Sequence, residues 1–221
     1  MIGYIRKVRR RFANIKQALG LIAWETKRYE IWLILQQLLF LTQPKKLVEF
    51  GAGRSTNYLA EYALKCGAEL LSIEQYLYYF LKVNLGLKLS FLPSCIVKYV
   101  PIKGDWYNVD AVKKYLSSFS GIDFLFIDGP TGSKAGKRDS WRFNDAVIPY
   151  LGDVKMIVID DVHRKECDNR ASDLAKRLNL KRYDIKSNDE SGDILAFLLN
   201  DDASQKISEL PAYMRSLLIL K

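Results

Sequence analysis

Cysteine and histidine are scarce in this chain of 221 residues. The three cysteines, Cys66, Cys95 and Cys167, are odd in number, far apart and without a Cys-x-x-Cys pair. This pattern argues against a disulfide framework and against a structural zinc site, so we predict reduced thiols and a cytoplasmic protein. His163 is the only histidine, and therefore the only imidazole available to exchange a proton near neutral pH.

The chain also lacks a hydrophobic run long enough to cross a bilayer. The apolar segment IWLILQQLLFL at 31–41 is interrupted by Gln36 and Gln37, is shorter than a membrane span and lacks a small-residue cleavage site. We therefore expect a soluble protein in which this run belongs to a basic helical N-terminal extension, residues 1–44. No internal repeat or low-complexity segment is present, and the length suits one α/β domain with an appendage.

Acidic residues are nearly absent from the N-terminal part. Residues 1–46 hold ten Lys and Arg but only Glu25 and Glu30, so this part carries +8 of the net charge of +9. Apolar side chains three or four positions apart at 4–19, with arginines between them, predict a basic amphipathic helix. It could rest on an anionic membrane surface or an acidic partner, or it could cap the sheet or form a homo-oligomer contact. Nucleic acid is a less suitable partner, because the remaining chain is close to neutral and contains no recognisable RNA-binding module.

Beyond residue 44, strand-like apolar segments alternate with helical ones. The strand-like segments lie at 45–50, 69–74, 95–102, 122–129 and 154–161, and two more, at 181–187 and 192–200, follow the last helix. Strands that alternate with helices predict parallel βαβ units with helices on both faces of the sheet. The expected fold class is α/β, with a doubly wound, mostly parallel, seven-stranded sheet at 45–200 and a C-terminal tail at 201–221.

Acidic residues gather at the predicted carboxyl ends of these strands. In open α/β sheets, ligands bind outside these ends. The acids concerned are Glu49, Glu74, Asp105, Asp128, Asp160 and Asp161. The sequence therefore places the functional site at this rim of the sheet.

The first strand runs into a glycine turn, VEFGAGRST at 48–56. Gly51 and Gly53 allow a tight bend and a close approach of a ligand to the backbone. The turn is a weak signal by itself, because a dinucleotide fingerprint requires a third glycine where this chain has Thr56. GPTGSKAGK at 129–137 does not have phosphate-loop spacing either.

Two carboxylates near the turn narrow the choice of ligand. Glu74 ends the second strand, where it can accept hydrogen bonds from both hydroxyls of a ribose. Glu49 would repel a pyrophosphate but can hold a cationic aminoacyl group. This combination favours S-adenosylmethionine over NAD or ATP.

Residues 45–199 resemble class I S-adenosylmethionine-dependent methyltransferases in strand order and in the motifs VEFGAGRST and LLSIEQ, the latter at 70–75. The resemblance implies a set of cofactor-binding residues. The methionine part would be lined by Glu49, Gly51 and Gly53, with Ser55 and Thr56 close by, the ribose would be held by Glu74, and adenine would be contacted by Asp105 and Trp106. The alternative is a domain with an empty or different nucleotide site.

The sequence MIVIDDVHR at 156–164 ends a buried strand on two adjacent carboxylates. Asp128 ends the preceding strand, which is the neighbour of this one in such a sheet. Three clustered anions repel one another unless a cation lies among them, so Asp128, Asp160 and Asp161 predict a Mg²⁺ site. The ion would hold two vicinal hydroxyls and lower the pKa of the reacting one. Alternatively, Asp161 caps the following helix and Asp128 belongs to a turn.

The same residues resemble those of metal-dependent O-methyltransferases. Catechol O-methyltransferase has acids at the matching strand ends, and macrocin-type sugar O-methyltransferases have paired aspartates followed two residues later by a histidine base. Asp160, Asp161 and His163 match that spacing. The resemblance implies that His163 is the general base, that Asp160 is catalytic with it, and that the acceptor is a sugar or another polyhydroxylated molecule.

The leading hypothesis is therefore a Mg²⁺-assisted, S-adenosylmethionine-dependent O-methyltransferase that acts on a small-molecule or glycan acceptor, in the cytoplasm or at the inner membrane face. Two alternatives stay open. One is a metal-independent methyltransferase in which Asp128, Asp160 and His163 contact the substrate. The other is a non-catalytic cofactor-binding scaffold that acts through its basic N-terminal helix. The basic loop at 129–141 is either a lid over the substrate or a solvated connection.

Overall fold

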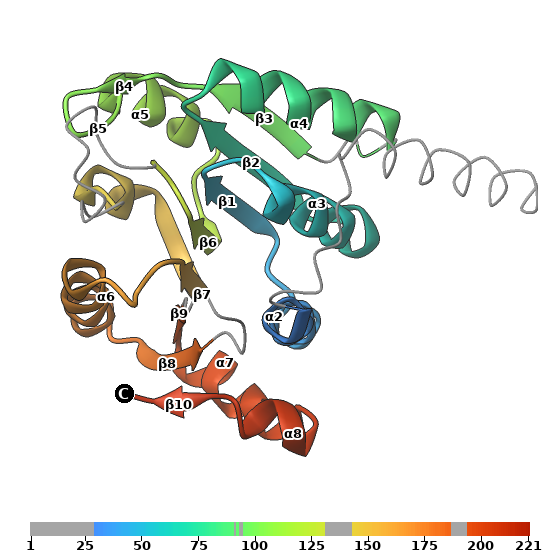
Figure 1. Cartoon of the computed structure of the whole chain (residues 1–221), viewed down its shortest axis with the longest axis vertical. Coiled ribbons are helices and arrows are strands. Elements are labelled where there is room, and N and C mark those ends of the chain that lie inside the picture. Colours follow the sequence, from blue (N-terminus) through green and yellow to red (C-terminus); the bar gives the residue numbers. More distant parts are fainter. Residues whose placement is uncertain (1–28, 91, 93–94, 131–142, 187–193) are drawn as a thin grey trace, which may run out of the picture.

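The structure, a computed structural model, describes residues 29–90, 92, 95–130, 143–186 and 194–221. The predicted basic helix at 4–19 and most of the loop at 129–141 lie outside the described residues. The described part is built around one eight-stranded sheet with helices on both faces (Figure 1). The strand order is β10-β8-β9-β7-β6-β1-β2-β3. The predicted fold class, α/β with a mostly parallel sheet, is confirmed.

Five neighbouring strands form the parallel part of the sheet. They are, in sheet order, β3 (Cys95–Tyr99), β2 (Glu69–Glu74), β1 (Lys46–Phe50), β6 (Ile122–Ile127) and β7 (Leu151–Ile159). The crossovers run through α3 (Arg54–Cys66), α4 (Leu77–Leu89), α5 (Val109–Ser117) and the 3-10 helix η1 (Asp145–Tyr150), and α6 (Lys165–Arg177) follows β7. Because β1 pairs with both β2 and β6, the chain reverses its direction of sheet growth at β1.

Beyond β7 the sheet continues in an antiparallel hairpin, which is formed by the two final strand-like segments. β9 (Ile194–Leu199) pairs with β7 on one side and with β8 (Lys181–Lys186) on the other. Residues 201–221, expected to be a tail, form α7 (Asp201–Gln205), η2 (Lys206–Glu209), α8 (Ala212–Arg215) and β10 (Ile219–Leu220). β10 pairs with β8, so it adds an eighth strand to the seven expected.

Two segments differ locally from the sequence pattern, and prolines lie at both. The helical segment expected between the strands at 122–129 and 154–161 has only the 3-10 turn of η1 in its described part, with Pro149 inside it, and β7 already begins at Leu151. The strand expected at 95–102 stops at Tyr99, before Pro101. A small hairpin, β4 (Ile102–Lys103) and β5 (Trp106–Tyr107), follows it, with Gly104 at φ +76° in the turn.

Two hydrophobic cores lie on opposite faces of the sheet, which explains the continuous apolar runs of β1, β6 and β7. Leu47 and Phe124 belong to the core shared with α3, α4 and α2 (Tyr29–Thr42). Their chain neighbours Val48 and Leu125 belong to the core shared with α5, η1 and α6. Successive side chains of a strand point to opposite faces, so burial on both faces requires an unbroken apolar run.

The apolar run at 31–41 is part of α2 and is used for packing. Ile34, Leu35, Leu38 and Leu39 are completely buried. Trp32 stacks on Tyr58 of α3 at a centroid distance of 5.0 Å, so α2 is fixed against the domain. Among the described residues, no helix is long and apolar enough to cross a membrane.

Candidate cofactor and acceptor site

The carboxyl ends of the parallel strands meet at one rim, and backbone hydrogen bonds join them. The amide of Gly51, after β1, donates to the Ile73 carbonyl of β2 at 2.9 Å. The amide of Asp128, after β6, donates to the Phe50 carbonyl of β1 at 2.9 Å. The point where the strand order reverses lies between β1 and β6, and this is where sheets of this kind bind ligands. The glycine turn and Asp128 occupy that point.

Gly51 is required by the packing of the rim. Its φ of +95° is unfavourable for any residue with a Cβ, and a Cβ there would lie 2.9 Å from the backbone carbon of Asp128 and from the amide nitrogen of Gly129. A Cβ on Gly129 would in turn lie 2.9 Å from the Gly51 backbone and 2.5 Å from the Tyr107 hydroxyl. The turn after β1 and the end of β6 therefore approach each other more closely than side chains allow.

Gly53 differs from Gly51, because a Cβ there would meet no heavy atom within 4 Å. Gly53 directly precedes α3, and its amide donates to the Thr56 hydroxyl at 2.8 Å. The space in front of Gly53 is thus open at the rim, and a ligand can approach the backbone there.

Glu49 lies below this turn and is completely buried. Its carboxylate accepts hydrogen bonds from the hydroxyls of Ser55, of Thr56 at 2.7 Å and of Ser72 at 2.5 Å. Burial raises the pKa of Glu49 to about 7, against the lowering effect of these hydroxyls. Thr56, which replaces the third glycine of a dinucleotide fingerprint, therefore ties the turn to the strand beneath it.

Glu74 ends β2 beside the same turn and is also buried. Its carboxylate accepts the amide of Tyr76 at 2.6 Å. Burial raises the pKa of Glu74, and hydrogen bonds from the backbone amides of Tyr76, Gln75 and Ala52 oppose the rise. Since Ala52 lies between the two glycines, Glu74 and the glycine turn form one unit. Sequence motifs that stand about 20 residues apart are joined by this contact.

Asp105 and Trp106, the predicted adenine contacts, lie on the β4–β5 hairpin. Asp105 is exposed in the turn of the hairpin. Trp106 is buried and packs against Phe50 at a centroid distance of 5.3 Å and edge-to-face against Tyr107 at 5.3 Å. Trp106 thus supports the end of β1 from within the core, and its contact with adenine stays a prediction.

On the other side of Asp128 lies the predicted catalytic cluster. Ile127 and Ile159 are register partners, so the following residues, Asp128 and Asp160, end neighbouring strands. Asp160 is buried, and its carboxylate accepts the amide of Asp161 at 2.7 Å. The structure therefore brings the ends of β6 and β7 together as the sequence predicted.

Asp161 begins the turn that leads to His163. Its φ of +64° is in the left-handed region, which Asp tolerates better than most residues. One carboxylate oxygen lies 3.1 Å from the Arg164 guanidinium, and the other lies 4.0 Å from Nδ1 of His163. The His163 side chain is 30% exposed. Asp161 thus holds a cation on one side and faces the imidazole on the other.

The guanidinium of Arg164 supplies positive charge to the acid cluster, for which the sequence suggested a metal ion. Within the described ranges, no group of three or more His, Cys, Asp and Glu side chains is arranged to hold a metal. Mg²⁺ commonly binds through one or two carboxylates and keeps several waters, so Asp128 and Asp160 would be its ligands here. The predicted Mg²⁺ site stays a prediction.

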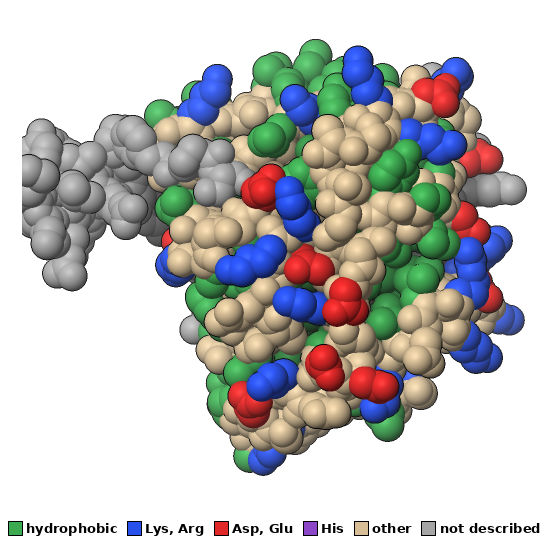
Figure 2. Space-filling view, turned by 180° about the vertical axis from the view of Figure 1, so that it is seen from behind, with side chains coloured by type: hydrophobic (Ala, Val, Ile, Leu, Met, Phe, Trp, Pro, Cys, Tyr) green, Lys and Arg blue, Asp and Glu red, His purple; other side chains and the backbone are tan. Residues whose placement is uncertain are grey.

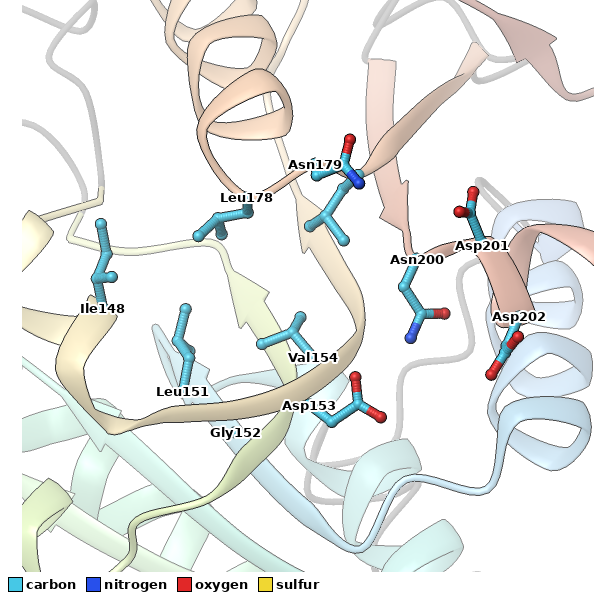
Figure 3. A pocket seen from close by; sticks show the side chains of 11 residues that line it. Ile148, Leu151, Gly152, Asp153, Val154, Leu178, Asn179, Asn200, Asp201 and Asp202 are labelled. Atoms are coloured by element: carbon cyan, nitrogen blue, oxygen red, sulfur yellow. The ribbon is translucent and has the colours of Figure 1, made fainter.

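A pocket of about 510 Å³ lies at the opposite end of the sheet (Figure 3). It is lined by the start of β7, the end of α6 and the segment after β9, and its side chains include Leu151, Asp153, Leu178, Asn200 and Asp201. Because β7 begins at Leu151 and reaches the rim only after Ile159, this pocket is separate from the candidate site.

Neither a family model nor a curated protein matches the sequence. Solved structures, in contrast, match the fold of this chain. An O-methyltransferase from Bacillus cereus in complex with S-adenosylhomocysteine is 14% identical, covers 88% of this chain and 91% of its own, and has a TM-score of 0.60. An O-methyltransferase from Streptomyces achromogenes involved in tomaymycin synthesis, in complex with S-adenosylmethionine, is 15% identical over 87% of this chain and 89% of its own, with a TM-score of 0.60.

These proteins share the fold of this chain. A methyltransferase from Podospora anserina, bound to S-adenosylhomocysteine, has a TM-score of 0.52 at 14% identity over 78% of both chains. The Rossmann-like methyltransferase fold predicted from the strand order and the two motifs is therefore confirmed. The macrocin-type resemblance is a finer prediction that these likenesses do not address.

Proposed function

We propose that this protein is an S-adenosylmethionine-dependent O-methyltransferase whose site is the rim around Gly53, Glu74 and Asp160. The observation that carries the proposal is the contact between Glu74 and the glycine turn, through the Ala52 amide. It joins the two predicted cofactor motifs at the point where the strand order reverses. The shared fold with O-methyltransferases that bind the same cofactor supports it.

The cofactor fits the open space in front of Gly53, where a Cβ would meet no atom. When bound, S-adenosylmethionine supplies an activated methyl group. In the proposed arrangement, Gly51 and Gly53 line its methionine part and Glu74 accepts hydrogen bonds from its ribose. Glu49 shapes the turn from below, because its carboxylate is already bonded to three hydroxyls.

His163 is the proposed general base, which accepts the proton of the acceptor hydroxyl. Asp161 lies 4.0 Å from Nδ1 of His163 and is fixed by Arg164, so its negative charge stabilises the imidazolium that forms. Asp160 holds the turn in place through its hydrogen bond to the Asp161 amide. The acceptor, by resemblance to macrocin-type enzymes, is a sugar or another polyhydroxylated small molecule or glycan.

The first form of this proposal is a Mg²⁺-assisted reaction, with Asp128 and Asp160 as the ligands of the ion. When bound, Mg²⁺ would lower the pKa of an acceptor hydroxyl. A metal-independent reaction is the second form, and the ion pair between Asp161 and Arg164 favours it, because this pair already balances one of the three charges. EDTA separates the two forms: it abolishes methyl transfer in the first and leaves it unchanged in the second.

The cofactor assignment is tested by titration calorimetry with S-adenosylhomocysteine. Glu74→Gln should weaken binding about 10-fold or more, as expected for loss of a charged hydrogen-bond acceptor. Glu69→Gln is the matched control, because Glu69 is an exposed residue at the other end of β2. Absence of binding to the natural chain, or equal affinities of the two variants, would refute the assignment.

Methyl transfer itself is tested with isotope-labelled cofactor and a panel of sugars and catechols. Transfer to a hydroxyl of any of them supports the proposal. Cofactor binding without transfer to the panel would favour the non-catalytic scaffold instead.

A further inference from the structure

The segment that follows Glu74 has an unusual charge distribution. Residues 75–104 contain no Asp or Glu, but four lysines, Lys82, Lys88, Lys98 and Lys103. This segment forms α4, the edge strand β3 and the strand β4. It is thus a part of the molecule with positive charge only.

Helix α4 is apolar on two faces, although only one of them packs on the sheet. Val83 and Leu87 are buried in the core. Leu77, Tyr78, Leu81 and Leu85 point away from it and are 52%, 66%, 56% and 53% exposed. A helix that is hydrophobic all round is ordinarily buried on all sides, so the outer face of α4 has the composition of a contact surface.

The apolar surface continues onto β3, the last strand of the sheet. Tyr99 of this strand is exposed and contacts Phe80 of α4 at a centroid distance of 5.9 Å. Tyr76, which directly precedes α4, and Tyr79 within α4 are exposed as well. The five exposed side chains of α4 together with Tyr76 and Tyr99 form what we call the α4 face: Tyr76, Leu77, Tyr78, Tyr79, Leu81, Leu85 and Tyr99. Figure 1 places α4 and β3 together at the upper end of the sheet, and the view of the molecule from behind in Figure 2 shows hydrophobic, Lys and Arg side chains along the upper part.

Tyrosine and lysine give this surface an interfacial character. The Lys82 ammonium lies 5.8 Å from the centre of the Tyr78 ring, and Tyr78 and Tyr79 pack edge-to-face at 5.3 Å. Tyr rings combine an apolar body with a polar tip, and Lys can bury its stem while its charge stays in water. These side chains therefore suit the boundary between apolar chains and charged head groups.

The charge of the α4 face decides between occupants. A second copy of this chain would bring two acid-free, lysine-bearing faces together. The N-terminal residues 1–28 would also bring positive charge against the α4 face, because they contain eight Lys and Arg and a single acid, Glu25. The complementary partner is apolar and anionic, as is a bilayer that contains acidic lipids.

We propose that the α4 face docks on an anionic membrane surface, with Leu77, Leu81 and Leu85 in contact with the acyl boundary and Lys82 and Lys88 at the head groups. This site is distinct from the basic N-terminal helix predicted at 4–19, and the two would act additively, since stable attachment commonly needs two weak signals. The proposal does not depend on methyl transfer.

Co-sedimentation of the full chain with vesicles tests the proposal. The vesicles consist of phosphatidylcholine alone or of equal parts phosphatidylcholine and phosphatidylglycerol. Leu81→Gln/Leu85→Gln should lower partitioning onto the anionic vesicles at least 10-fold. Lys82→Gln/Lys88→Gln should lower it roughly 5-fold per lysine at low salt. Gln keeps the helix propensity of both residues.

Matched controls lie on other helices. Leu64→Gln removes an exposed leucine of α3, and Lys113→Gln/Lys114→Gln removes two exposed lysines of α5. These controls should bind anionic vesicles within 2-fold of the natural chain. Thermal unfolding of each variant checks that its fold is intact.

Three results would overturn the proposal. The first is that the natural chain fails to bind the anionic vesicles. The second is that the α4 variants bind as tightly as the natural chain, which would assign attachment to the N-terminal segment. The third is that Leu81→Gln/Leu85→Gln abolishes self-association while vesicle binding is unchanged. The last result would make the α4 face an interface between copies.

Discussion

The buried carboxyl group of Glu49 should make the stability of the protein depend on pH in a predictable direction. Burial raises its pKa from 4.5 to about 7, with the charge of Glu74 as a further contribution. The folded state therefore binds the Glu49 proton more tightly than the unfolded state does. The stabilisation linked to this proton is complete below pH 4.5 and is lost as the pH rises to about 7.

The size of the effect follows from the two pKa values. A difference of about 2.5 units corresponds to about 3 kcal/mol, at about 1.4 kcal/mol per unit. Glu49→Gln removes the ionisation but keeps the shape of the side chain. Ser55, Thr56 and Ser72 can satisfy an amide as well, because a hydroxyl both donates and accepts. The free energy of unfolding of the variant minus that of the natural chain should therefore rise by about 3 kcal/mol between pH 4.5 and pH 8.

Urea unfolding followed by circular dichroism at half-unit steps of pH measures this difference, and other titrating groups cancel in it. Glu69→Gln, at the exposed start of β2, is the control and should show no such rise. A flat difference for Glu49→Gln, or one that falls with pH, would show that the pKa of Glu49 is not raised in the folded protein, because the three hydroxyls offset or outweigh its burial.

Three further predictions concern the two glycines of the turn and the base. Gly51→Ala should destabilise the protein by about 3 kcal/mol in urea unfolding, because φ is +95° and the Cβ would meet the Asp128 backbone. Gly53→Ala should cost at most about 1 kcal/mol but weaken S-adenosylhomocysteine binding at least about 10-fold by filling the open space; Gly86→Ala, equally uncrowded but in α4, should leave binding unchanged. His163→Ala should lower turnover by roughly 10² to 10⁴ without a change in cofactor affinity, and an unchanged rate would remove His163 from the mechanism.

The fold class and the position of the rim could be predicted from the sequence, because both depend on local patterns. Apolar runs such as 122–127 mark strands buried on both faces, and helical segments between them require parallel pairing. Parallel strands have all their carboxyl ends at one edge, so residues such as Gly51, Asp128 and Asp160 meet there although they are far apart in the chain.

Contacts that depend on tertiary packing could not be predicted. Thr56 looked like a failed third glycine, whereas it bonds to Glu49 inside the fold. Trp106 follows an exposed turn, but the β4–β5 hairpin buries it against Phe50. Residues 201–221 have short, mixed sequence patterns. The eighth strand at their end, β10, forms only because β8 would otherwise be the edge of the sheet. For the hairpin, Pro101 and Gly104 were available signals.

The rim holds buried carboxyl groups and one partly exposed imidazole, and under the proposed function this difference in exposure assigns the base. Glu49 and Glu74 are buried, and burial raises the pKa of both. Glu49 is already bonded to three hydroxyls of the turn, and Glu74 is assigned to the ribose of the cofactor. The proton removed from an acceptor must reach water before the next turnover, and a completely buried Glu49 has no path for it. His163 is partly exposed and faces Asp161, which is fixed by Arg164. The imidazole can therefore take a proton from a bound hydroxyl and release it to solvent.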